Sequence, residues 1–327
     1  MFLHFYLCIV EKENLKKGLL FGTIAIFTIG LQPVIANSRP KVIDPYLFAA
    51  ITSIIEALIF LPIYILERRK LKYNINNKQD EKQQILNESL LNGWKKTKNV
   101  KLILLIGLTF SFVPILNYIG FEQAGAINSS LIFKSEIIFA LVFGYVFLKE
   151  KITLIQGLFC LLLFFGLIIS VTQGSFNFLD LNLGVPILLT SVTIFMFVHT
   201  LTKSGFDRNE LFPSQVVFMR NLISGIIISS IYFLFFPRNF FIVLDPINFI
   251  FFLLMGVDYG VSLFLWYKTL TFLEIGKASV ILSLTPIVSA FFSFIILGEL
   301  FTVFNLIGTG IAIFSITIIV RKKKEKD

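Results

Sequence analysis

Long apolar stretches of about 20 residues recur along almost the whole chain. A helix of about that length crosses the roughly 30 Å hydrocarbon core of a bilayer. The stretches are continuously apolar rather than alternating, which predicts helices and not a β-barrel. Ten segments can be marked off, at 17–37, 46–66, 102–121, 124–148, 152–172, 183–203, 214–236, 247–267, 276–297 and 302–320. The pattern predicts an all-α integral membrane protein with ten transmembrane helices.

Composition supports this assignment. The chain is 56% hydrophobic and only 15% charged, and 39 of its 327 residues are phenylalanine. A soluble domain has about 25% charged residues, and a chain this apolar has too little polar surface to cover a core in water. The composition excludes a soluble globular protein.

The distribution of positive charge predicts the orientation. The chain has 29 Lys and Arg residues and a net charge of +9, which by itself would suit nucleic acid. If the N-terminus is cytoplasmic, however, 24 of these 29 residues fall in inner loops or tails and three in outer loops. Cytoplasmic loops are enriched in this way. We expect a multi-pass protein of the cell membrane with both termini cytoplasmic, attraction to anionic lipids and no nucleic-acid partner.

The spans divide the chain into two similar halves. We expect an N-terminal cytoplasmic segment at 1–16, a first five-helix repeat at 17–172 and a connecting outside loop at 173–182. A second five-helix repeat at 183–320 and a basic tail at 321–327 complete the chain. The first repeat contains a long cytoplasmic loop at 67–101, within which a weak amphipathic helix is predicted to rest on the inner leaflet.

An internal repeat relates the two halves. A shift of 149 residues places Tyr118 on Tyr267 and Glu150 on Glu299, with other matches between them. Five is an odd number of spans, so the two halves are predicted to have opposite orientations in the membrane. Inverted repeats of this kind are typical of secondary transporters, whose binding sites lie near the membrane midplane.

The second half carries the clearest family resemblance. Residues 267–313 resemble the second half of an EamA-type transporter of the drug/metabolite transporter superfamily. The matching residues are Tyr267, Ala278, Ser279, Thr285, Pro286, Leu297, Gly298, Glu299 and Gly308. The resemblance implies two inverted five-helix bundles and transport of small metabolites or drugs, often outward. Lys134 and Glu136 are not part of the family pattern, and Ile137 replaces the proline of the second half.

Lys134 and Glu136 are unusual because they interrupt an apolar span. On insertion scales each costs about 2.5–3.5 kcal/mol at a helix centre, so both must face protein or trapped water. In an unbroken α-helix two positions two residues apart point about 200° apart. We therefore expect that they do not pair with each other and that each needs a partner on another helix, such as Asp258 or Glu56.

Polar residues on other spans complete a predicted pocket. Asp258, Ser262 and Trp266 share one helix face at four-residue spacing, and Ser283 is expected opposite Lys134. Tyr118 and Asn117 occupy the corresponding region of the first half. The predicted substrate-binding residues are Lys134, Glu136, Asp258, Ser283, Ser262, Trp266, Tyr118 and Asn117.

This pocket favours a secondary transporter. One cation with one or two carboxylates suits a zwitterion or an organic anion, carried by alternating access with proton coupling or exchange. Glu136 or Asp258 is a candidate carrier of the coupling proton. A structural ion pair that locks the halves together is the alternative for Lys134. Flippase-like handling of an amphiphile is the alternative function, because an aromatic groove open to lipid would have a similar sequence.

Other chemistry has little support in the sequence. Two histidines and two cysteines show no metal-ligand spacing, and no nucleotide motif is present, so no enzyme activity, metal or cofactor is predicted. His199 is interpreted as a packing residue and Arg220 as an interfacial anchor. Glu150 and Glu299 are interpreted as helix caps or anchors. We expect a small-molecule substrate, contact with membrane lipids and a monomer or homodimer.

The predicted pocket can be tested by two substitutions. Lys134→Ala and Asp258→Asn are each expected to abolish transport while leaving folded protein in the membrane, because each removes a charge that the pocket needs. Transport in proteoliposomes and the amount of protein in the membrane fraction provide the measurement. Normal transport by both variants would contradict the assignment of the pocket.

Overall fold

The computed structural model describes residues 2–77, 81–148, 152–176, 182–273, 278 and 281–320, and leaves the side chains of residues 2–15, 148, 238, 283, 319 and 320 outside this description. These residues form helices joined by short connections, and no strand occurs among them. The α-helices are α1 (Phe2–Ser38), α2 (Pro45–Asn76), α3 (Glu81–Asn92), α4 (Thr97–Thr109), α5 (Val113–Ala124), α6 (Ala126–Ile132), α7 (Glu136–Leu148), α8 (Leu154–Val171), α9 (Gly184–Asp207), α10 (Pro213–Phe235), α11 (Pro246–Phe272), α13 (Thr285–Leu297) and α14 (Val303–Val320). Short 3-10 helices are η1 (Gly93–Lys95), η2 (Phe133–Ser135), η4 (Pro237–Leu244) and η5 (Leu282–Leu284).

Eight helical segments of the described chain are long and apolar enough to cross a membrane. Two of them combine helices, because α4 with α5 covers Thr97–Ala124 and α6 with α7 covers Ala126–Phe147. Two shorter apolar helices, Thr285–Leu297 and Val303–Ile318, lie where the ninth and tenth spans are predicted. The all-helical membrane architecture is confirmed, whereas ten membrane crossings and opposite insertion of the halves remain predictions.

The helix boundaries differ from the predicted spans at the amino-terminal end and in the long loop. α1 begins at Phe2, so the predicted segment 1–16 and the first span form one helix. α2 continues to Asn76 and α3 covers Glu81–Asn92, so much of the predicted loop 67–101 is helical. In the long loop, sequence patterns miss such helices because polar residues can form a helix without an apolar signal.

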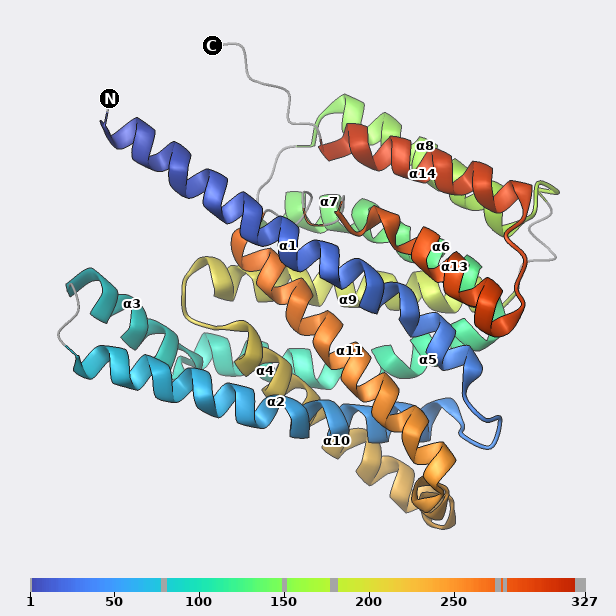
Figure 1. Ribbon diagram of the computed structural model, residues 1–327, viewed down its shortest axis with the longest axis horizontal. Helices are drawn as coiled ribbons and strands as arrows, with labels where there is room; N and C mark the ends of the chain where they lie inside the picture. Colours follow the sequence, from blue (N-terminus) through green and yellow to red (C-terminus); the bar gives the residue numbers. More distant parts are fainter. Residues whose placement is uncertain are drawn as a thin grey trace.

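The helices pack as pairs into one elongated bundle (Figure 1). α10 lies along α2, α1 along α11, α5 along α9, and α14 along α8 at the edge of the bundle. α8 and α14 approach closely through glycine, since a Cβ atom on Gly308 would lie 2.6 Å from the Gly166 carbonyl oxygen. Small residues commonly allow such backbone contact between membrane helices.

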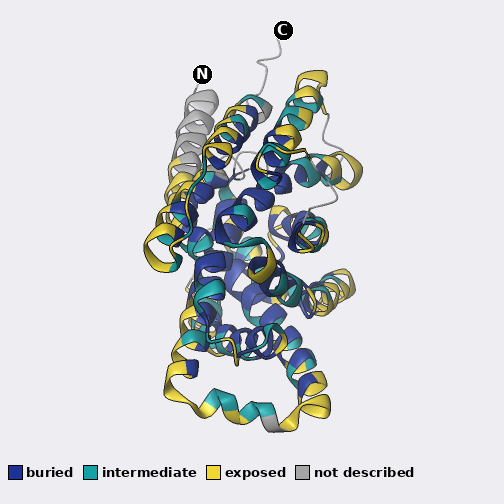
Figure 2. Cartoon of the chain, turned by 90° about the vertical axis from the view of Figure 1, so that its right-hand side faces the viewer, coloured by how far each residue is buried: buried dark blue, intermediate teal, exposed yellow. Residues whose placement is uncertain are grey.

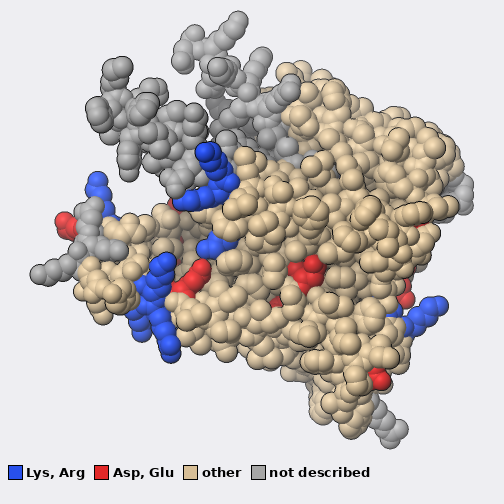
Figure 3. Space-filling view, viewed as in Figure 1, with Lys and Arg blue, Asp and Glu red and all other residues tan. Residues whose placement is uncertain are grey.

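Burial and charge follow the pattern of a membrane protein. Buried residues lie along the middle of the bundle and exposed residues along its rim (Figure 2). On the face shown in Figure 3, Lys and Arg gather at the left-hand end, with fewer at the right-hand end. The surface between these two ends is mostly uncharged, with one patch of acidic atoms near its middle. The exposed apolar side chains include many leucines and phenylalanines, which suit contact with lipid.

The boundaries of the elements repeat with the 149-residue shift found in the sequence. η2 at Phe133–Ser135 corresponds to η5 at Leu282–Leu284. α7 corresponds in the same way to α13, and α8 to α14, each with both ends shifted by 149 residues. The fourth and ninth predicted spans therefore each change from α-helix to a tighter 3-10 turn, at η2 and η5, and the two turns are at matching positions.

Glu299 connects the two halves at the start of α6. Its carboxylate accepts hydrogen bonds from the backbone N–H groups of Ala126 and Ile127, at 3.0 and 3.1 Å. These groups have no partner within the helix, and the helix dipole favours a negative charge there. The prediction that Glu299 acts as a cap is confirmed, while Glu150 lies outside the described residues.

Glu210, in the connection between α9 and α10, forms a charged cluster with the first half. Its carboxylate lies 2.7 Å from Lys96 Nζ, 3.0 Å from Lys98 Nζ and 2.7 Å from Arg208 Nε. Asn99 donates a further hydrogen bond at 3.0 Å. Burial raises the pKa of the Glu210 carboxyl, but the hydrogen bonds from Arg208, Lys96, Asn99 and Lys98 outweigh it and hold the pKa well below its ordinary value.

Glu210→Gln is therefore expected to lower the free energy of unfolding near neutral pH by about 1–2 kcal/mol, because it removes charge-assisted hydrogen bonds whose partners are partly exposed. A carboxyl with a lowered pKa stabilises the fold above the unfolded pKa, and this contribution is lost as the pH falls through the folded pKa. The difference between wild type and variant should thus shrink below about pH 4.5, the ordinary value.

The measurement is thermal unfolding in detergent across that pH range. Glu88→Gln on the exposed side of α3 is the matched control and should change little. A Glu210→Gln defect that is equally large at pH 7 and at strongly acidic pH would contradict the electrostatic origin.

Candidate functional site

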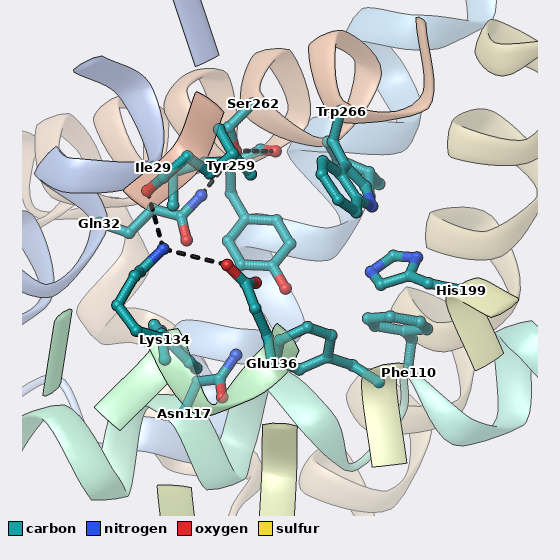
Figure 4. A pocket seen from close by; sticks show the side chains of 14 residues that line it. Ile29, Gln32, Phe110, Asn117, Lys134, Glu136, His199, Tyr259, Ser262 and Trp266 are labelled. Atoms are coloured by element: carbon teal, nitrogen blue, oxygen red, sulfur yellow. Dashed lines mark hydrogen bonds and ion pairs between the residues drawn. The ribbon is translucent and has the colours of Figure 1, made fainter. Parts of the chain in front are cut away.

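A cavity lies in the middle of the bundle between α1, α9, α11 and the break in the fourth span (Figure 4). Its empty volume is about 590 Å³, including the part that opens to solvent. The lining residues are Ile29, Gln32, Phe110, Asn117, Phe133, Lys134, Glu136, Phe195, His199, Tyr259, Ser262, Leu263, Trp266 and Leu282.

Lys134 and Glu136 both line the cavity, and they form an ion pair. Lys134 Nζ lies 3.0 Å from Glu136 Oε1, and the two side chains are only 2% and 11% exposed. The expectation that the two cannot pair is wrong because the α-helix changes to the 3-10 helix η2 at Phe133–Ser135. Two positions two residues apart lie about 200° apart around an α-helix, which is about 160° measured the shorter way. With about three residues per turn, this shorter angle between the two side chains falls to about 120°. The flexible lysine stem spans the remainder.

Lys134 also connects the two halves. Its Nζ donates a hydrogen bond of 2.9 Å to the carbonyl oxygen of Leu282, in the matching break η5 (Figure 4). Broken helices free carbonyl groups for such contacts, and in transporters they often surround the binding site. One cation thus joins a carboxylate of the first half to a backbone carbonyl of the second.

One face of α11 forms the opposite wall. Tyr259, Ser262 and Trp266 follow at helical spacing and all line the cavity. The Ser262 hydroxyl accepts a hydrogen bond of 2.6 Å from Gln32 Nε2 on α1 and donates one of 2.8 Å to the Tyr259 carbonyl. This contact fixes a polar side chain of α1 against the wall, leaving the Gln32 carbonyl oxygen available for a solute.

His199 on α9 contributes an aromatic wall. Its ring lies edge-on to the rings of Phe195, Trp266 and Tyr267, with centroids 5.4–6.1 Å apart. Its Nδ1 is buried and has no hydrogen-bond partner among the described residues. The sequence-based interpretation as a packing residue is therefore incomplete, because the ring also lines the cavity.

The other predicted site residues are placed differently. Asn117 lines the cavity and accepts a hydrogen bond of 2.6 Å from Ser191. Tyr118 is fully buried against Phe48 instead, at a ring distance of 4.7 Å, and does not line the cavity. Asp258 does not line it either, although it is buried at 9% exposure. The side chain of Ser283 lies outside the described residues.

Sequence reasoning missed Gln32, Phe110, Phe133, Phe195 and Tyr259 as lining residues. Gln32 gave a weak signal as an amide within an apolar span. The phenylalanines gave none, because 39 of them are distributed along the chain and only packing shows which face the cavity.

Arg220 is the clearest correction outside the cavity. It was predicted to anchor at the membrane surface, yet its side chain is 1% exposed. Its guanidinium carbon lies 3.9 Å from the ring centre of Phe110. Glu56 Oε2 lies 3.7 Å from Arg220 Nη2. A buried arginine is retained here because a carboxylate and an aromatic ring replace water.

Comparisons with known proteins agree with this architecture. A model of the EamA-like transporter family matches residues 16–172 and 182–321. An "Uncharacterized transporter" from Methanothermobacter thermautotrophicus (strain Delta H) is 24% identical over 310 residues, covering 91% of this chain and 85% of that protein. A crystal structure of a protein superposes with a TM-score of 0.65 over 93% of this chain and 96% of that chain. At 11% identity, this last likeness shows the fold alone.

Disrupting the buried pair should destabilise the protein. Glu136→Ala leaves Lys134 buried with a carbonyl partner only, and is expected to cost about 3–5 kcal/mol. Replacing both residues, Lys134→Met with Glu136→Leu, should recover most of this loss because no unpaired charge remains. Thermal unfolding in detergent measures both effects. A double variant as unstable as Glu136→Ala would contradict the ion-pair account.

Proposed function

Because this chain belongs to the EamA-like transporter family, we propose that it is a secondary transporter, driven by protons or by exchange, of a small polar or amphiphilic solute. In this proposal both termini are cytoplasmic and alternating access operates around the central cavity. The observation that carries the proposal is the Lys134–Glu136 pair, held inside the cavity where the fourth span breaks.

The charges in the cavity suggest an amino-acid-like zwitterion or an organic anion. Lys134 would attract the solute carboxylate, and Glu136 would attract an ammonium group, so that a zwitterion exchanges the internal pair for two external ones. Such exchange keeps every buried charge partnered, which limits the desolvation cost. Phe110, Tyr259 and Trp266 offer ring faces to an apolar or aromatic side chain.

In this proposal one half moves against the other, and two polar contacts between the halves hold the two sides closed in turn. Glu210 of the second half binds Lys96 and Lys98 of the first. At the start of α6, Glu299 of the second half binds backbone groups of the first. In the proposed cycle, opening on one side breaks the local contact there while the other remains. Outward transport is the proposed direction.

Counterflow in proteoliposomes tests the proposal. A panel of labelled amino acids and organic acids is presented to protein loaded with the unlabelled compound, and trans-stimulated exchange is expected for at least one zwitterion or organic anion. Lys134→Met should reduce this exchange by at least about tenfold, equivalent to about 1.4 kcal/mol of lost binding. Glu88→Gln, on α3, should exchange normally.

Three outcomes would contradict the proposal. Exchange without trans-stimulation would indicate a channel, and a chemically changed solute would indicate an enzyme. Protein-dependent movement of labelled lipid between leaflets, without any solute exchange, would favour the flippase-like alternative. If Lys134→Met exchanges as fast as wild type, the cavity pair does not bind the solute.

A further inference from the structure

A second charged cluster lies behind one wall of the cavity. Glu56 on α2 and Arg220 with Asn221 on α10 are all at most 2% exposed. None of the three lines the cavity. The rings of Phe110 and Tyr259 separate the two sites, since both line the cavity and both lie near the guanidinium, at 3.9 and 5.7 Å. The proposed binding of a solute in the cavity does not use these three residues.

The pairing within the cluster is indirect. Arg220 Nε donates to Asn221 Oδ1 at 2.9 Å, and Asn221 Nδ2 donates to Glu56 Oε2 at 2.7 Å. The guanidinium itself stays 3.7 Å from that oxygen, beyond ordinary hydrogen-bond length. Arg220 Nη1 is buried and has no partner in the described part of the chain. The hydroxyls of Tyr259 and Tyr267 also face the guanidinium.

Asp258 is a second buried carboxyl near Glu56, and it also has a polar atom without a hydrogen-bond partner among the described residues. It lies on α11, which packs against α2, and its carboxyl interacts electrostatically with Glu56. Its Oδ2 is buried without a hydrogen-bond partner among the described residues. Within that same part of the chain, no Lys, Arg or His nitrogen lies within ion-pair distance of Asp258.

Charge balance then requires one bound proton. Glu56 has the Arg220 guanidinium nearby, whereas an ionised Asp258 would be an uncompensated negative charge away from water. The other titratable groups facing the cluster are Tyr118 from α5, His199 from α9, and Tyr259 and Tyr267 from α11. The described cations on α1 are Lys16 and Lys17, and Arg39, just after the helix, binds Glu122. None of these groups adds a second positive charge beside Asp258.

We propose that Asp258, beside the cluster of Glu56, Asn221 and Arg220, is a proton site, distinct from the substrate cavity, that binds and releases the coupling proton. In the described conformation the proton resides on Asp258, because Glu56 already has the amide and the guanidinium as partners. A metal ion is not the ligand, since the guanidinium would repel it. This inference rests on the proposed transport function for the coupling, although the bound proton itself does not depend on it.

The same contacts link the proton to the cavity. When the Asp258 O–H bond breaks and the proton passes to water on the open side, the new carboxylate repels the carboxylate of Glu56, which is linked to Arg220 through Asn221. A shift of the guanidinium would act on Phe110 and Tyr259, whose rings it contacts and which form the cavity wall. Proton release and solute binding would thereby affect each other, as linkage requires.

Infrared difference spectroscopy of the wild-type protein in liposomes tests the bound proton directly. At pH 7 we expect the carbonyl band of a protonated carboxylic acid, with slow exchange in deuterium oxide because the group is buried. Labelling aspartate side-chain carboxyls with ¹³C should shift this band, whereas labelling glutamate should not. Absence of the band, or a shift with glutamate only, would overturn the assignment to Asp258.

Variants provide the second measurement. Asp258→Asn should remove the band, and Glu122→Gln, whose side chain is 58% exposed and binds Arg39, should leave it unchanged. In transport, Asp258→Asn should lose accumulation driven by a pH gradient but keep counterflow exchange. This narrows the expectation from sequence, which was loss of all transport.

The transport probes are labelled leucine and phenylalanine. Gradient-driven accumulation by Asp258→Asn equal to wild type would overturn the coupling role. If the wild type moves neither these probes nor any other solute of the panel while the infrared band shifts as expected, the proton site stands and the transport function fails. If wild type exchanges solute but has no band, the transport function stands and the proton site fails.

Discussion

The structure depends on the requirement that every charge inside an apolar bundle has a partner. Lys134 meets this requirement with a carboxylate two residues away and a backbone carbonyl from the other half. Both partners become available only because the helices at η2 and η5 leave regular α-helical geometry. Without the break, the lysine and the glutamate would diverge, and the Leu282 carbonyl would remain within its helix. The local departure from regular structure thus makes the buried charges tolerable.

The remaining buried polar groups follow the same rule outside the cavity. Glu56, Asn221 and Arg220 form a chain of partners, and Glu299 satisfies two backbone N–H groups at the start of α6. Each set joins helices that are far apart in sequence. Polar contacts therefore determine which helices meet, while the apolar majority fills the volume between them.

The sequence predicted the helical membrane architecture and the family well, because both depend on segment length and on motifs read along the chain. It also identified Lys134, Glu136, Ser262, Trp266 and Asn117, all of which line the cavity. It failed where a property depends on three-dimensional packing. The pairing of Lys134 with Glu136 requires the 3-10 turn at Phe133–Ser135, and the residue types in this segment do not predict such a turn. The burial of Arg220 requires Glu56 and Phe110, which are distant in sequence.

The repeat of element boundaries has a further consequence. From α7 to Val171, and again from α13 to Val320, the chain keeps one constant offset, so the two copies have diverged by substitution without insertion or deletion. The charged pair occurs in one copy only, since Ser283 and Thr285 occupy the positions of Lys134 and Glu136. Two segments with matching helix boundaries therefore differ in charge, so the electric field inside the cavity is asymmetric and would orient a dipolar solute.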